Sequence, residues 1–169
     1  MRNVLVAVIF QLGWLACVLS GARDRPLDAL VSAAAVTACN LWLQRARPAA
    51  GLRLAAWAAL VGFGVESVNR AAGVYALTDT PTPAWLCPLW LLALWVMFAT
   101  LLRGPLAWLS GRYALSAALG ALFAAPNYFA GARLGAVTMS PDAAYAAAVL
   151  SLGWAAALPL LVWLSTESR

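Results

Sequence analysis

The sequence contains no lysine and no histidine, and these two absences exclude several kinds of chemistry. Without histidine there is no Ser-His triad, no imidazole base and no histidine-ligated metal. Without lysine there is no P-loop and no Schiff base. The cysteines Cys17, Cys39 and Cys87 form no CxxC pair, so they indicate neither a metal site nor a redox motif. We therefore expect no metal and no cofactor, and any catalysis would depend on carboxylates or tyrosines.

Charged residues are scarce as well. Only 10% of the residues are charged and 64% are hydrophobic, whereas a soluble domain has about 25% charged residues. The mean hydropathy is +0.84. The net charge of +5 comes from arginines scattered between apolar runs, and without a clustered basic face it excludes nucleic acid as a partner. This composition is typical of an integral membrane protein.

Six apolar stretches occupy most of the 169 residues. A membrane-spanning helix needs about 20 mainly apolar residues, and a helix satisfies its own backbone hydrogen bonds in lipid. The sequence therefore predicts an all-α fold, a polytopic transmembrane helix bundle in one integral membrane domain over residues 1–169. The predicted helices are residues 4–19, 27–43, 54–73, 85–102, 113–137 and 143–164.

The distribution of charge between the predicted loops indicates an orientation. One side of the bundle receives every aspartate, and the other side receives Arg2, Arg45, Arg47, Arg53, Arg103, Arg112 and Arg169. Cytoplasmic loops of membrane proteins carry an excess of basic residues. We therefore predict that both termini are cytoplasmic.

One acidic side chain falls inside a predicted helix. Glu66 lies thirteen residues after Arg53, which is about 20 Å along a helix and therefore in the outer half of the bilayer. Asn69 and Arg70 follow Glu66 at spacings of three and four residues, so the three side chains share one face. An ionised acid at this depth costs about 2 to 3 kcal/mol, and some interaction has to offset that cost.

Other polar residues reach a similar depth on other helices. Counting from Arg112 places Asn127 and Tyr128 about 22 to 24 Å along their helix, and Gln11 lies nearer the middle of the first helix. Gln11 and Asn127, like Asn40 of the second helix, are also suited to hydrogen bonds that join helices.

Two interpretations of Glu66 follow from these positions. In the first, Glu66 forms an ion pair with Arg70 inside one helix and has no chemical role. In the second, Glu66 lines a polar pocket with Asn69, Asn127 and Tyr128 that opens to the outer leaflet, and its carboxyl group binds a ligand or moves a proton. The candidate ligand-binding residues are Glu66, Asn69, Arg70, Asn127, Tyr128 and Gln11, and Glu66 is the candidate catalytic residue.

Four stretches of the sequence together resemble a known family. They are FQLGWLACVL at residues 10–19, PLWLLALWVMFATLL at 88–102, PLAWL at 105–109 and YFAGARLGAV at 128–137. These stretches are similar to the uncharacterised bacterial inner-membrane family called domain-of-unknown-function family 2878, in which an acid is expected in the third helix. The resemblance implies a multi-pass protein of the bacterial inner (cytoplasmic) membrane. Genes of that family lie near lipid-modifying enzymes such as cyclopropane-fatty-acid synthases, which implies a lipid-related role.

Three functions remain open at this point. The leading hypothesis is a non-catalytic accessory or binding protein whose partners are membrane lipids or lipid-modifying enzymes. The first alternative is an intramembrane enzyme that modifies a lipid or isoprenoid with Glu66 as acid or base. The second alternative is a small-solute binding or transport subunit, which a closed cavity with tryptophan-lined walls would favour. The sequence assigns no oligomeric state.

Overall fold

Six helices make up most of the structure, as the apolar stretches predict. The computed structural model describes residues 1–45, 47–77, 83 and 85–167. The helices are α1 (Arg2–Ala22), α2 (Pro26–Leu43), α3 (Pro48–Ala71), α4 (Leu89–Leu102), α5 (Tyr113–Arg133) and α6 (Ala143–Glu167). A short 3-10 helix, η1 (Ala107–Leu109), follows α4, and two short strands, β1 (Tyr75–Ala76) and β2 (Thr138–Met139), complete the fold. The all-α helix bundle is confirmed.

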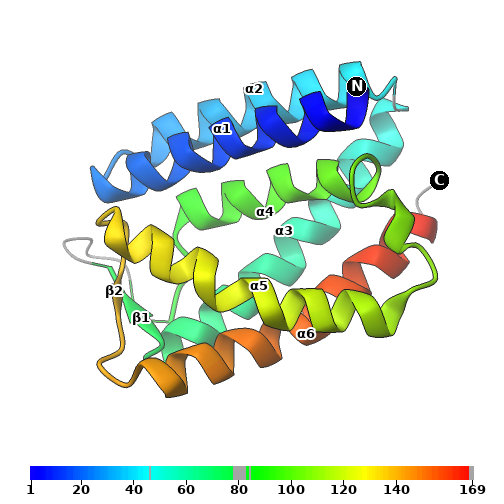
Figure 1. Cartoon of the computed structure of the whole chain (residues 1–169). Coiled ribbons are helices and arrows are strands. Elements are labelled where there is room, and N and C mark those ends of the chain that lie inside the picture. The colour runs from blue at the N-terminus through cyan, green and yellow to red at the C-terminus, as the bar shows by residue number, and fades with distance from the viewer. Residues whose placement is uncertain (46, 78–82, 84, 168–169) are drawn as a thin grey trace.

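The helices form two antiparallel pairs with two further helices between them. The pair α1 and α2 lies on one side of α4, and the pair α5 and α6 lies on the other side, with α3 crossing behind (Figure 1). Both termini lie at the same end of the bundle (Figure 1). This arrangement agrees with an even number of crossings, while the orientation of the bundle in the membrane stays a prediction.

Five of the helices are long and apolar enough to span a bilayer, and α4 is the exception. It has 14 residues, about 21 Å at 1.5 Å per residue. The sequence predicts a start at Trp85, but Pro88 occupies the N-cap position and the helix begins at Leu89. Most of α4 is buried, because α1, α2 and α3 all pack against it. A helix that is apolar on all sides is typical of such a central position.

The helices α3 and α5 end in the same way, and both ends differ from the prediction. Helix α3 ends at Ala71 rather than at residue 73, and α5 ends at Arg133 rather than at residue 137. Gly73 and Gly135 follow with φ angles of +68° and +85°. In each case two backbone hydrogen bonds of the Schellman type close the helix, for example from the Val74 amide to the Asn69 carbonyl at 2.9 Å.

The chain segments after these two glycines pair with each other. Strand β1 is antiparallel to β2, with Tyr75 opposite Met139 and Ala76 opposite Thr138. The sequence prediction contained no strand. Because this pairing joins the loop after α3 to the loop after α5, it fixes the position of Tyr75 relative to both helices.

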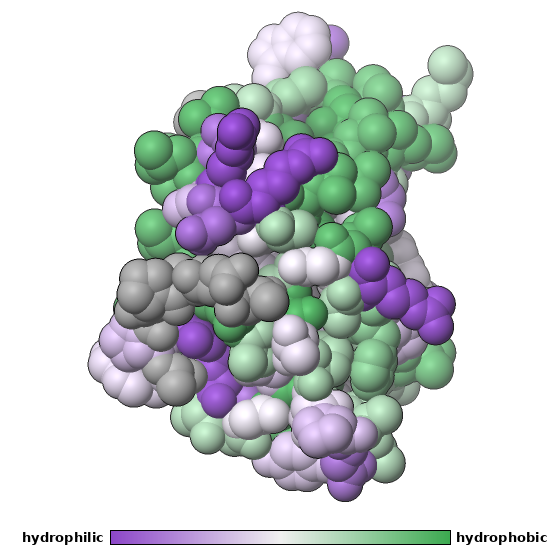
Figure 2. Space-filling view, turned by 90° about the vertical axis from the view of Figure 1, so that its left-hand side faces the viewer, coloured by the Kyte–Doolittle hydropathy of each residue, from purple (hydrophilic) through white to green (hydrophobic). Residues whose placement is uncertain are grey.

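The end of the bundle that carries the β1–β2 sheet also carries charged residues. Figure 2 looks onto this end and shows hydrophilic groups separated by apolar ones. The turn between α1 and α2 contains Arg23, Asp24 and Arg25, and Arg25 forms an exposed ion pair with Asp28 at 3.8 Å. Exposed ion pairs of this kind contribute little to stability.

One of the predicted interhelical hydrogen bonds is present. The fully buried Asn40 donates from Nδ2 to Thr100 Oγ1 at 3.0 Å, which joins α2 to α4. The prediction is wrong for Asn127, whose Nδ2 donates to the Phe123 carbonyl of its own helix at 2.7 Å.

The Schellman end of α3 leads to a first prediction. An ideal Cβ at Gly73 meets nothing within 4 Å, and the same holds for Gly64 in the middle of α3. Because only Gly73 has a positive φ, Gly73→Ala should lower the free energy of unfolding by about 1 kcal/mol. Gly64→Ala, the matched control, should leave it unchanged or raise it slightly. Denaturation in mixed detergent micelles measures both values, and equal values for the two variants would contradict the assigned role of Gly73.

Candidate functional site

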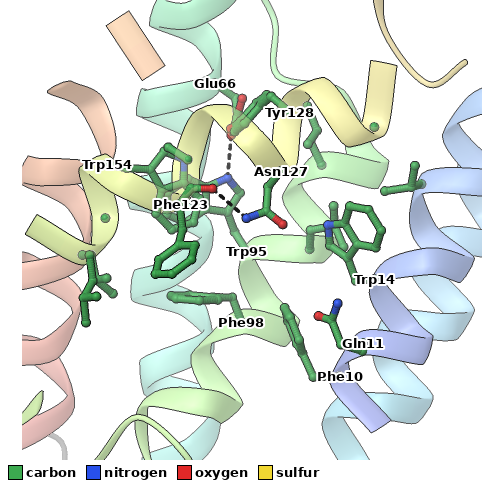
Figure 3. A pocket seen from close by; sticks show the side chains of 18 of the residues that line it. Phe10, Gln11, Trp14, Glu66, Trp95, Phe98, Phe123, Asn127, Tyr128 and Trp154 are labelled. Atoms are coloured by element: carbon green, nitrogen blue, oxygen red, sulfur yellow. Dashed lines mark hydrogen bonds between the residues drawn. The ribbon is translucent and has the colours of Figure 1, made fainter. Parts of the chain in front are cut away.

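Glu66 lies near the end of α3 and is fully buried. Its relative exposure is 0%, and it precedes the end of the helix at Ala71 by five residues, about 7.5 Å along the axis. The side chain points toward α4 and α5 rather than toward lipid (Figure 3). A buried carboxyl group needs hydrogen-bond partners because it has lost those that water would provide.

Three side chains from three different elements donate hydrogen bonds to Glu66. The Tyr75 hydroxyl of β1 donates to Oε2 at 2.8 Å, and Trp95 Nε1 of α4 donates to Oε1 at 2.8 Å (Figure 3). The Tyr128 hydroxyl of α5 also donates to Oε1. An ionised carboxylate accepts hydrogen bonds and cannot donate them, so these three donors suit its charged form. One side chain of α3 thereby ties together β1, α4 and α5.

The position of Trp95 depends on a glycine in α3. An ideal Cβ at Gly62 would lie 2.2 Å from the Trp95 ring, which is closer than a Cβ approaches a non-bonded atom. On its other side the Trp95 indole stacks on Trp154 of α6, with ring centroids 4.4 Å apart and an interplanar angle of 18°. Gly62 and Trp154 therefore hold the indole at the depth of Glu66.

Arg70 does not form the ion pair that its spacing from Glu66 predicts. Its guanidinium donates from Nη1 to the Leu86 carbonyl instead. The ion pair found within 4.0 Å among the described residues joins Arg25 to Asp28 and does not involve Arg70 or Glu66. Arg70 is itself 8% exposed, so it does not extend to the outer surface. It anchors the loop before α4 instead of neutralising Glu66.

Asn69 lies beside Glu66 on α3 and is also buried, at 2% exposure. Its Nδ2 has no hydrogen-bond partner among the described residues. Asn69 therefore belongs to the same polar region without donating one of the three hydrogen bonds to the carboxylate.

A large cavity lies beside the Glu66 cluster, defined as Glu66, Tyr75, Trp95 and Tyr128. Its volume is about 480 Å³ and its walls come from α1, α4, η1, α5 and α6, with Glu66 contributed by α3. The walls are mainly aromatic and aliphatic. The aromatic side chains are Phe10, Trp14, Trp90, Trp95, Phe98, Trp108, Phe123, Tyr128 and Trp154. A cavity of this size suits a small ligand or part of a larger apolar one.

The cavity opens between α1 and α5. Phe123 of α5 is 56% exposed and Trp108 of η1 is 49% exposed, although both line the cavity. Gln11 of α1 and Asn127 of α5 line it as well, on opposite sides in Figure 3. The prediction is therefore wrong about the polarity of the pocket. The groove is predominantly apolar, and its few polar side chains include Gln11, Asn127, Tyr128 and Glu66.

The structure brings together some of the predicted residues and adds others. Tyr128 lies against Glu66, and Gln11 and Asn127 lie in the same cavity, whereas Arg70 points away. The sequence prediction missed Tyr75 and Trp95. The tyrosine could have been found from its position two residues after Gly73, where a left-handed turn reverses the chain toward the end of α3.

Residues 3–160 match a family described as protein of unknown function (DUF2878). The chain belongs to this family. No curated protein and no solved structure matches this DUF2878 protein.

The chemistry available to this DUF2878 protein follows from its geometry. In the described part of the chain, no group of three or more cysteine, aspartate or glutamate side chains could hold a metal ion. Glu66 can accept hydrogen bonds or exchange a proton with Tyr128 or Tyr75. The groove can hold an apolar molecule, and Glu66 is among its lining residues although the side chain has no exposed surface.

The hydrogen bonds to Glu66 lead to a second prediction. In Glu66→Gln the amide oxygen still accepts from Trp95 and Tyr128, and the amide nitrogen donates to Tyr75 once that hydroxyl rotates. Glu66→Leu leaves these donors without an acceptor, which costs about 1 to 3 kcal/mol for each buried donor. We therefore expect thermal unfolding in detergent to be close to wild type for Glu66→Gln and markedly earlier for Glu66→Leu. Equal stability of Glu66→Leu and wild type would show that the three hydrogen bonds are not needed.

Proposed function

We propose that this membrane protein binds the apolar chain of a lipid in the groove between α1 and α5. The observation that carries the proposal is the cavity of about 480 Å³ whose walls are aromatic and aliphatic and whose mouth includes the exposed Phe123. A molecule dissolved in the bilayer reaches such a mouth without crossing water. Burial of its chain against the walls gains dispersion contacts that mobile lipid tails provide less well.

The length of the groove supports a chain-like ligand. Along α5 the lining residues extend from Leu119 to Gly131, a distance of about 18 Å. Trp108 and Leu106 line it near one end, and Val137 and Trp90 line it near the other. A chain lying along α5 would pass the Glu66 cluster on its way, so the one acidic side chain of the lining would face a specific part of the ligand.

An enzyme that modifies such a lipid is the second candidate. It is favoured by the position of Glu66 in the wall of the same groove, where the carboxylate shares hydrogen bonds with Tyr128 and Tyr75. A carboxyl group beside a bound chain can serve as general acid or base. A lipid class that changes in cells lacking the gene, and that well-expressed Glu66→Gln fails to restore, would favour the enzyme over the binding protein.

The third candidate, a small-solute binding or transport subunit, has less support. Tryptophans do line the cavity, as that hypothesis requires. Its mouth between α1 and α5, however, consists of residues such as Phe123 and Trp108, which suit a ligand that arrives from lipid better than a solute that arrives from water.

A pair of glycines provides the test of lipid binding. Gly131 lines the groove and an ideal Cβ there meets nothing within 4 Å, and the same open space surrounds Gly64, which does not line it. Gly131→Leu should fill the groove, whereas Gly64→Leu should only add an apolar side chain to an exposed face of α3. We expect mass spectrometry of lipids extracted from the purified proteins to show a lipid enriched with wild type and with Gly64→Leu, and reduced about tenfold with Gly131→Leu.

Two outcomes of this experiment would contradict lipid binding in the groove. One is the absence of any lipid enriched over the detergent background in the wild-type preparation. The other is recovery of the same lipid in the same amount from Gly131→Leu, which would place the bound lipid elsewhere on the protein.

A further inference from the structure

The charges around the groove limit which lipids it can hold. Among the described residues that line it, Glu66 is the one with a carboxyl group, Tyr128 has a weakly acidic phenol, and no arginine is part of the lining. An anionic group placed inside would therefore lose its hydration without meeting a cation, and it would also be repelled if Glu66 is ionised. Protonation of Glu66 would remove this repulsion and supply an O–H donor, but it would supply no positive charge.

Among the described residues, the arginines on the elements around the groove do not line it. Arg133 of α5 lies two residues after the lining residue Gly131 and is exposed. Arg70 of α3 is buried, donates to the Leu86 carbonyl and does not line the groove. Arg112 lies 5.8 Å from the centroid of the Trp108 ring, and it is exposed beyond one end of the groove. Arg112 is therefore next to a lining residue without lining the groove itself, and the described lining residues include no positive charge.

Besides Glu66 and Tyr128, the polar groups that line the groove are neutral indoles and amides. The buried Trp154 Nε1 has no hydrogen-bond partner among the described residues, and the amides of Gln11 and Asn127 are exposed. Asn127 uses its Nδ2 to bond the Phe123 carbonyl, so its Oδ1 is left as an acceptor toward the cavity. Gln11 lies on the opposite wall, and its amide offers both a donor and an acceptor (Figure 3). A hydroxyl group can donate to Asn127 Oδ1 and also accept from an amide N–H of either residue. A carboxylate or phosphate can only accept from those N–H groups, and it leaves Asn127 Oδ1 without a donor.

We infer that the groove selects an uncharged lipid whose polar group is a hydroxyl, held between Gln11 and Asn127 while its chain lies along α5. This inference rests on the proposed lipid binding and adds the chemical class of the ligand. Long-chain alcohols and isoprenoid alcohols belong to this class, and fatty acids and lipid phosphates do not.

Competition between three lipids of equal chain length tests the inference. The wild-type protein is placed in phosphatidylcholine nanodiscs, and a dibrominated octadecanol quenches the fluorescence of the tryptophans that line the groove. Octadecanol, octadecanoate and octadecyl phosphate then compete at alkaline pH, where both anionic groups are ionised. We expect octadecanol to reverse the quenching at a concentration at least about tenfold lower than either anion.

A charge introduced at Gln11 provides the matched variant. Gln11→Lys should improve competition by octadecanoate by about tenfold, because the new ammonium pairs with the carboxylate. Gln11→Met, which has a similar shape and no charge, should leave octadecanoate weak. The comparison of the three lipids on the wild-type protein stands even if Gln11→Lys does not accumulate.

The possible results separate the two proposals. If octadecanoate or octadecyl phosphate competes as well as octadecanol, the inference about charge is wrong and lipid binding stands. Strong competition by octadecyl phosphate that Arg112→Gln abolishes would also contradict the inference about charge. It would place the anionic end of the lipid at the mouth beside Trp108. If none of the three lipids reverses the quenching, lipid binding in the groove is itself contradicted.

Discussion

The burial of a carboxyl group among membrane helices is the constraint on which the rest of this structure depends. Glu66 has no exposed surface and no cation within ion-pair distance among the described residues. Its hydrogen bonds therefore have to come from neutral donors, and those donors lie on β1, α4 and α5. Since a missing donor leaves a polar group unpaired in a medium without water, the positions of these three elements are coupled to one side chain.

Several local features of the sequence serve this coupling. Gly73 reverses the chain after α3 so that Tyr75 returns toward Glu66, and pairing with Thr138 and Met139 fixes that return. Gly62 leaves room for the Trp95 indole. With the donors in place, α5 packs against α6 rather than against α1. The aromatic groove lies in the space between α1 and α5. The acidic cluster and the proposed lipid site are in this sense parts of one arrangement.

The sequence predicts the helices well because each apolar run is long and bounded by proline, glycine or charge. Residue counting along helices also places Tyr128 at the depth of Glu66 correctly. The sequence does not reveal the contact of Trp95 with Glu66, because α4 is apolar on all sides and its composition does not indicate which face meets α3. It fails for Arg70 as well, since the spacing of four residues permits an ion pair, while the Leu86 carbonyl that binds the guanidinium comes from a loop. Strands of two residues, such as β1 and β2, carry no periodic pattern.

The hydrogen bond from Trp95 to Glu66 offers the most direct test that Glu66 couples the surrounding helices. It joins two helices through groups that only the folded core brings together. Nuclear magnetic resonance of the protein labelled with ¹⁵N at its indoles, with Trp95→Phe for assignment, follows the exchange of each indole proton with solvent deuterium. We expect the Trp95 proton to exchange slowly in the wild-type protein and rapidly in Glu66→Leu, while the proton of the exposed Trp42 exchanges rapidly in both proteins. A Trp95 proton that exchanges as rapidly as that of Trp42 in the wild-type protein would contradict this coupling.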